Sequence, residues 1–128
     1  MALITIDYDN TLSTKRIQNL VKQIWNTNDI FVLTSRLDCL KLKEYNLNSN
    51  DDLYATCEEV GIPERNVIFT NQVKKLYWIQ NSKVDIHIDD DDSEIRIINS
   101  LSNTKCFDAK LEKTPDDVLE YLELIKNF

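Results

Sequence analysis

Two groups of aspartates each follow a short apolar run in the sequence. Asp7 and Asp9 come after the run 2–6, and four consecutive aspartates at 89–92 come after the run 84–88. Residues two apart in a strand point to the same side, so Asp7 and Asp9 can act together. If the two runs are neighbouring strands, these carboxylates converge and repel one another unless some are protonated or a cation lies among them. Because the ligands are all oxygen atoms, Mg²⁺ is the expected cation.

A third apolar run, 30–33, ends in Thr34, Ser35 and Arg36. Hydroxyls and free backbone N–H groups at a strand end suit the oxygens of a phosphate group. Thr34 and Ser35 could equally be ordinary capping hydroxyls. Arg36 could reach a second phosphate or the backbone of a substrate, although a surface ion pair is the commoner role for an arginine in such a place.

Two lysines lie near this acidic region. Lys74 and Lys75 fall near the start of an expected helix, 71–81, which precedes the run 84–88. Adjacent helical residues point about 100° apart, so only one of the two lysines can easily face the site. The spacing within the helix leaves the choice between them open.

The apolar runs alternate with amphipathic stretches along the whole chain. Each run is short and rich in Ile, Val and Phe, and the expected strands are 2–6, 30–33, 67–69, 84–88 and 105–107. The other segments have apolar residues at helical spacing, and the expected helices are 14–25, 51–60, 71–81, 92–101 and a last helix with Thr114 as its N-cap and Pro115 first. This alternation predicts an α/β fold, a three-layer Rossmann-like sandwich around a five-stranded, mainly parallel sheet. Ligands bind such sheets beyond the carboxyl ends of the strands.

Some polar residues near the site have ordinary structural explanations. Asp91 and Asp92 are typical of a solvated acidic helix start, and Asp92 could cap the helix 92–101. His87 is better explained as a hydrogen-bonded histidine within or beside the sheet than as a catalytic base.

The chain has 128 residues, which suits a single domain spanning 1–128. Its formal net charge of −7 disfavours a broad nucleic-acid-binding face, because such binding depends on neutralising phosphates. The cysteines at 39, 57 and 106 are widely spaced and are expected to be reduced thiols of a cytoplasmic protein. The apolar N-terminal run is too short for a signal peptide or a membrane span, so no membrane partner is expected.

Taken in order, the polar features resemble the four motifs of the haloacid dehalogenase-like (HAD) phosphohydrolase superfamily. The resemblance covers residues 3–95 and rests on the ordered set rather than on one motif. The matching positions are Asp7-x-Asp9-x-Thr11 for the first motif, Thr34 for the second, Lys75 or Lys74 for the third, and Asp89-Asp90 for the fourth. Lys75 is preferred because its distance in sequence from Asp89 is close to the spacing in short members of the superfamily.

The resemblance implies a phosphoric monoester hydrolase that uses an aspartyl-phosphate intermediate. Asp7 corresponds to the nucleophile, and Asp9 to the group that protonates the leaving oxygen and then activates water. The Asp7 carboxylate, the Asp9 backbone carbonyl and the Asp90 carboxylate, helped by Asp89, are expected to hold Mg²⁺.

The same resemblance suggests which residues contact the phosphorylated substrate. Thr34 is expected to bond the phosphoryl oxygens, and Lys75 to neutralise charge on the nucleophile and the transferring group. Ser35, Arg36 and Asn10 complete the expected substrate-binding set. Asn10 stands where many members have Gly, and Asn tolerates the left-handed backbone of a tight turn.

The segments 12–29 and 37–66 leave room for helices but not for the cap domain with which many members cover small substrates. An open, capless site suggests a nucleotide, a polynucleotide end or another macromolecule as substrate, with nucleic acid expected only in that capacity. A non-catalytic binding or regulatory protein with the same fold is the alternative. The sequence leaves the oligomeric state open.

Overall fold

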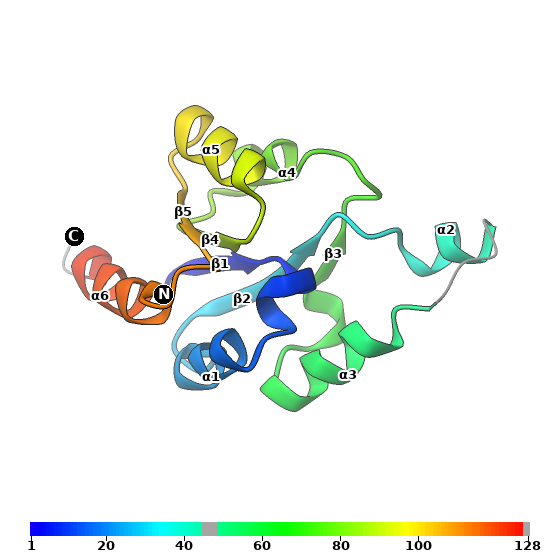
Figure 1. Ribbon diagram of the computed structural model, residues 1–128, viewed down its shortest axis with the longest axis horizontal. Coiled ribbons are helices and arrows are strands. Elements are labelled where there is room, and N and C mark those ends of the chain that lie inside the picture. Colours follow the sequence, from blue (N-terminus) through cyan, green and yellow to red (C-terminus); the bar gives the residue numbers. More distant parts are fainter. Residues whose placement is uncertain (45–48, 127–128) are drawn as a thin grey trace.

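The chain forms a five-stranded, all-parallel sheet with helices on both faces (Figure 1). The computed structural model describes residues 1–44 and 49–126. The strands lie in the order β3-β2-β1-β4-β5. They are β1 (Leu3–Ile6), β2 (Asp29–Thr34), β3 (Val67–Phe69), β4 (Ile86–Asp89) and β5 (Lys105–Asp108). The expected Rossmann-like three-layer architecture is confirmed, with every strand pair parallel.

The helices divide between the two faces of the sheet, as Figure 1 shows with α4 and α5 above it and α1, α3 and α6 below. The α-helices are α1 (Lys15–Ile24), α2 (Cys39–Glu44), α3 (Asp51–Val60), α4 (Lys75–Ser82), α5 (Asp92–Leu101) and α6 (Thr114–Lys126), and two short turns are η1 (Tyr8–Leu12) and η2 (Glu64–Asn66). The larger core joins α1, α3 and α6 to the sheet, and the smaller core joins α4 and α5 to the opposite face.

The helical periodicity explains how α1 packs on the sheet. Its apolar positions Ile17, Leu20, Val21 and Ile24 are all buried, as their spacing along one helix face predicts. The next expected helix over this layer, α3, has the predicted bounds and ends at Gly61, whose left-handed φ of 89° closes the helix.

The structure corrects several predicted boundaries. The helix expected over 71–81 begins only at Lys75, because Asn71 and Gln72 have left-handed backbone angles that a helix cannot contain. The last helix begins at Thr114 itself, whose hydroxyl donates to the backbone oxygen of Asp108. The short helix α2 was not predicted.

The segments after β1 and β2 contain only short elements in the part of the chain that the structure describes. Residues 7–28 form η1 and α1, and the described residues between β2 and β3 form α2, α3 and η2. No further folded unit is inserted among these described segments. Within 1–44 and 49–126, no helix combines the length and the apolar character needed to cross a membrane.

Candidate active site at the carboxyl ends of β1 and β4

Two neighbouring central strands bring the sequence-distant aspartates together. β1 and β4 pair in parallel, with Thr5 beside His87, and the backbone N–H of Asp7 continues the pairing by donating to Ile88. Because side chains alternate along a strand, Thr5 and Asp7 share one face, and so do His87 and Asp89. That face is the one covered by α4 and α5.

Lys75, the first residue of α4, completes this buried group. Its Nζ lies 2.8 Å from Asp7 Oδ1 and 2.7 Å from Asp89 Oδ2. All three residues are at most 5% exposed. Lys74 is exposed to solvent. Of the two lysines that the sequence left open, Lys75 is therefore the one in contact with the acidic group.

A buried histidine holds Asp89 from the other side. His87 Nε2 lies 2.7 Å from Asp89 Oδ2, and His87 Nδ1 lies 2.7 Å from the hydroxyl of Thr5. Complete burial lowers the pKa of His87, so its ring is neutral near pH 7. We therefore assign the Nε2 proton to the bond with Asp89, which leaves Nδ1 to accept from Thr5. This agrees with the structural role predicted for His87.

The two buried aspartates differ in their affinity for protons. Burial raises the pKa of Asp7 to about 8, which the ammonium group of Lys75 only partly offsets and the charge of Asp89 reinforces. Burial also disfavours the ionised form of Asp89, but the hydrogen bonds from His87 and Lys75 and the ammonium charge of Lys75 outweigh it and lower the pKa of Asp89. The pKa of Lys75 is raised because two carboxylates overcome its burial.

Asp89 is saturated by hydrogen bonds. Its Oδ2 accepts from Lys75 and His87, and its Oδ1 accepts from the backbone N–H groups of Asp90 and Asp91, at 2.9 and 3.1 Å. A carboxylate offers about four lone-pair directions, so these bonds occupy all of them. Asp89 is thus well placed to orient its neighbours.

Asp7 and Asp90 have carboxylate oxygens in less crowded surroundings. Asp7 Oδ2 and Asp90 Oδ1 each lie 3.5 Å from the hydroxyl of Thr11. Ligand atoms of Asp7, Asp89 and Asp90 lie within 4.8 Å of one another, which is close enough for a shared metal ion. The all-oxygen donor set fits a hard cation such as Mg²⁺.

A small pocket opens above these carboxylates, with a volume of about 210 Å³. The expected site residues that line it are Asp7, Asp9, Asn10, Ser35, Lys75, Asp89 and Asp90. Asn10 has a φ of 58°, so the left-handed turn that its side chain tolerates is present. Glu94 and Asp91 also line the pocket. Glu94, which is half-buried, was not predicted from the sequence. Its place in the pocket depends on how the start of α5 lies beside the end of β4, and no local pattern shows this.

Thr34 and Arg36 do not line the pocket in this structure. Thr34 is fully buried, and its hydroxyl accepts a hydrogen bond from the backbone N–H of Arg36 at 3.2 Å. The side chain of Arg36 points to two carboxylates instead, those of Asp9 and Asp52. Of the residues expected to bind a substrate, Ser35 and Asn10 therefore reach the pocket directly.

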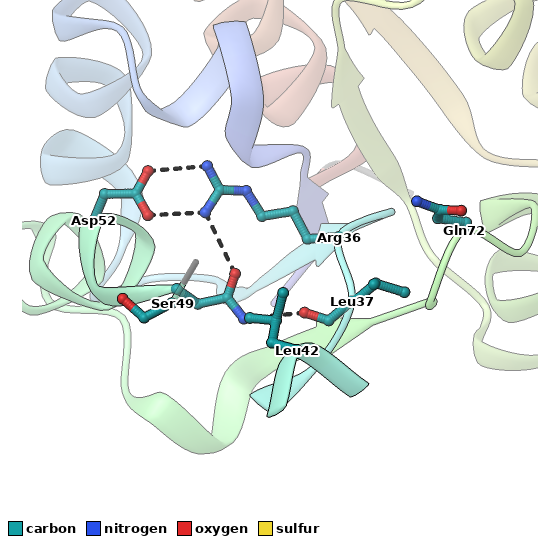
Figure 2. A pocket seen from close by; sticks show the side chains of 7 residues that line it. Arg36, Leu37, Leu42, Ser49, Asp52 and Gln72 are labelled. Atoms are coloured by element: carbon teal, nitrogen blue, oxygen red, sulfur yellow. Dashed lines mark hydrogen bonds and ion pairs between the residues drawn. The ribbon is translucent and has the colours of Figure 1, made fainter. Parts of the chain in front are cut away.

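Arg36 borders a second, larger pocket of about 760 Å³, which Figure 2 shows together with Asp52, Ser49 and Gln72. Its guanidinium bonds Asp52 at 2.8 and 2.9 Å and Asp9 at 2.7 and 2.9 Å. The hydrogen bonds from Arg36 lower the pKa of Asp52. Asp52 was not predicted from the sequence, since no local pattern links the start of α3 to the end of β2.

The acids beyond Asp90 mainly support structure. Asp91, rather than the expected Asp92, is the N-cap of α5, and its side chain accepts from the backbone N–H groups of Ser93 and Glu94. Asp92 instead pairs with Lys110 at 2.8 Å.

The chain matches no protein-family model, and a search of curated proteins finds no significant match.

Proposed function

We propose that this chain is a Mg²⁺-dependent phosphatase of the HAD type that hydrolyses a phosphate monoester. The observation that carries the proposal is the contact of Lys75 with both Asp7 and Asp89, beside Asp90, at the ends of β1 and β4. Buried carboxylates with a perturbed pKa in a pocket are typical of functional sites. The order of these residues along the chain agrees with the superfamily motifs.

The residues present fit a magnesium ion. Asp7 and Asp90 would hold it, with the backbone carbonyl of Asp9 as the family resemblance implies. Asp89 would act mainly by orienting Lys75, because its own oxygens already accept four hydrogen bonds. When bound, the ion would shield the Asp7 carboxylate from the negative charge of the phosphate group.

The protein residues divide the reaction into two displacements. In the first, an Asp7 carboxylate oxygen forms a bond to phosphorus while the bond from phosphorus to the alcohol oxygen breaks, and Asp9 donates its proton to that oxygen. In the second, Asp9 takes a proton from water, whose oxygen attacks phosphorus and breaks the bond to Asp7. Inorganic phosphate leaves, and both aspartates return to their starting states.

Lys75 and Ser35 support the transferring group. The Lys75 ammonium lies beside the nucleophile, where it can offset charge that develops on the phosphoryl oxygens. Ser35 lines the pocket and offers a hydroxyl. The open pocket is compatible with a nucleotide, a polynucleotide end or another macromolecular phosphate.

The test is hydrolysis of p-nitrophenyl phosphate with Mg²⁺, and again after the metal is removed with EDTA. We expect turnover only with the metal, and a loss of about 10³-fold or more in Asp7→Asn, because the nucleophile is removed. Asp116→Asn, the same change at an exposed position of α6, is the matched control and should retain activity.

Turnover that persists unchanged in Asp7→Asn would remove Asp7 from the nucleophile role. Mg²⁺ binding without hydrolysis of any ester in a panel of nucleotides, phosphopeptides and phosphate-ended oligonucleotides would favour the non-catalytic alternative.

A further inference from the structure

We propose that Arg36 is a positioning residue that holds the Asp9 carboxylate at the edge of the small pocket, and that Asp52 anchors Arg36 for this task. The inference rests on the proposed function, in which Asp9 transfers the proton to and from the reacting oxygens. It assigns Arg36 a role other than the substrate binding expected from the sequence, and it brings in Asp52, which no motif covers.

The hydrogen bonds of Arg36 are directed entirely to protein groups. Nε and one terminal nitrogen bond the two oxygens of Asp9, at 2.9 and 2.7 Å. Both terminal nitrogens bond Asp52, and one also reaches Asn50 Oδ1 at 3.4 Å (Figure 2). A guanidinium has five N–H donors, so these five contacts use its full capacity. Arg36 therefore has to break a protein contact before it can bind a substrate.

The guanidinium is fixed on more than one side. It lies over the ring of Tyr8, 4.9 Å from the ring centre, and Tyr8 is itself buried. Asn50, at the start of α3, is 3% exposed and is held in turn by its own bond to the backbone oxygen of Leu37. A planar fork held by a ring and by two carboxylates has little freedom to rotate.

Asp9 needs such support because solvent, and not packed protein, surrounds about half of its side chain. Its side chain is 52% exposed, and it lies in the turn just before the left-handed Asn10. Both of its oxygens are engaged by Arg36, which sets the plane and direction of the carboxylate. A proton-transfer group has to lie within hydrogen-bond reach of the reacting oxygen, so this orientation bears directly on the reaction.

The charges also argue against a second anion on the substrate at this place. One guanidinium is shared by Asp9 and Asp52, and Asp52 alone balances its charge. Arg36 therefore has no positive charge left over to attract a second anionic group of the substrate. Positioning is thus the role that the electrostatics favour.

The experiment compares two esters of nearly the same shape, phenyl phosphate and p-nitrophenyl phosphate, with Mg²⁺ present. The nitrophenolate ion leaves readily without a proton, whereas phenol depends on protonation of its oxygen. Misplacing Asp9 through Arg36→Gln should therefore lower kcat on phenyl phosphate by about 10²-fold, with a much smaller loss on p-nitrophenyl phosphate. KM should change little for either ester, because Arg36 does not contact the substrate.

Further variants separate positioning from a general effect on the fold. Asp52→Asn should change the ratio between the two esters in the same direction but less, and Arg36→Lys should restore it only in part, because an ammonium group cannot form the two-pronged contacts. In an Asp9→Asn background, Arg36→Gln should cause no further loss. Arg65→Gln, the same substitution at an exposed position, is the control.

Three results would overturn the proposal. The first is an equal loss of activity on both esters. The second is a gain of activity in Arg36→Gln, which would mean that Arg36 holds Asp9 away from the reacting oxygen. The third is strict additivity of the shifts in Tm for Arg36→Gln and Asp9→Asn, because paired residues should be coupled. If coupling is present but the wild-type chain hydrolyses no monoester, the proposed function fails and takes this role of Arg36 with it. If the wild-type chain is active without coupling, the positioning role alone fails.

Discussion

At Asp7, burial in the protein opposes the negative charge of the carboxylate. It is 5% exposed and shares the single ammonium group of Lys75 with Asp89. Burial raises its pKa to about 8, against 3.8 for a free aspartate, and the ammonium group of Lys75 offsets only part of this shift. A raised pKa in the folded chain means that ionising Asp7 costs folding free energy. Its contribution to stability therefore declines as the pH rises from about 4 to about 8 without a cation.

Binding of Mg²⁺ should for the same reason depend on pH. Below about pH 8 the ion has to displace a proton from Asp7, so we expect the affinity to increase from pH 6 to pH 8 and then to level off. The increase should be at most about tenfold per pH unit, as for one released proton. Isothermal titration calorimetry in buffers of different ionisation enthalpy measures both the affinity for Mg²⁺ and the number of protons released on binding. An affinity that is independent of pH, or an unchanged pH dependence in Asp7→Asn, would contradict this prediction.

Lys75 and Lys74 are adjacent lysines, one buried and one exposed, so the same substitution at each should have a different effect on stability. Lys75→Gln should lower the free energy of unfolding by about 3 kcal/mol, because it leaves the buried Asp89 carboxylate without its cation and Asp7 without its hydrogen-bond donor. Lys74→Gln should change it by less than about 0.5 kcal/mol, because Lys74 is exposed. Urea denaturation followed by circular dichroism distinguishes the two. Similar losses in both variants would mean that Lys75 is not held as described.

At the scale of elements, strand alternation explains why chemically useful residues gather on one face. Thr5 lies in β1 and Asp7 follows the strand two residues later. His87 and Asp89 are likewise two residues apart in β4. Because the strands are adjacent and parallel, both pairs end at the same edge of the sheet. Lys75, the first residue of α4, then lies over this edge.

The start of α5 gives a testable case in which two neighbouring acids have different roles. Asp91→Ala should lower the free energy of unfolding by about 1 kcal/mol, because the side chain caps two backbone N–H groups. Asp92→Ala should cost less, because it removes only an exposed ion pair with Lys110. Thermal unfolding of both variants checks the order, and a larger loss for Asp92→Ala would restore Asp92 as the cap.

At the scale of the whole molecule, the sheet separates two apolar cores, and each contains a buried cysteine. Cys57 lies in the core under α1, α3 and α6, and Cys106 lies in the core under α4 and α5. Burial raises the pKa of Cys57 to about 11 and raises that of Cys106 as well. Cys39 is exposed.

These positions predict the reactivity of the three thiols. In the native protein, Cys39 should react with Ellman's reagent at once, whereas Cys57 and Cys106 should react only as the chain unfolds, because a reactive thiol has to be both ionised and accessible. If both cores unfold together, the two buried thiols should become reactive at the same urea concentration. Cys39→Ser removes the fast phase and serves as the control. Fast reaction of two or more thiols in the native protein would contradict the described packing.

The sequence alone was sufficient for the features that depend on local backbone geometry. The alternation of short apolar runs with helical patterns predicted the parallel α/β sheet, because side-chain periodicity follows from the nearest residues. The same local reasoning placed the acids at the ends of the first and fourth strands. Asn10 tolerates the left-handed backbone that the structure has at this position.

Only the tertiary structure decided which of these residues meet. The strand order places Asp7 beside Asp89, the depth of α4 selects Lys75 over Lys74, and neither follows from a local pattern. The direction of Arg36 depends on Asp52, which lies on a separate helix. Such contacts depend on burial and charge balance between segments that are far apart in the sequence, and packing of the chain is what brings those segments together.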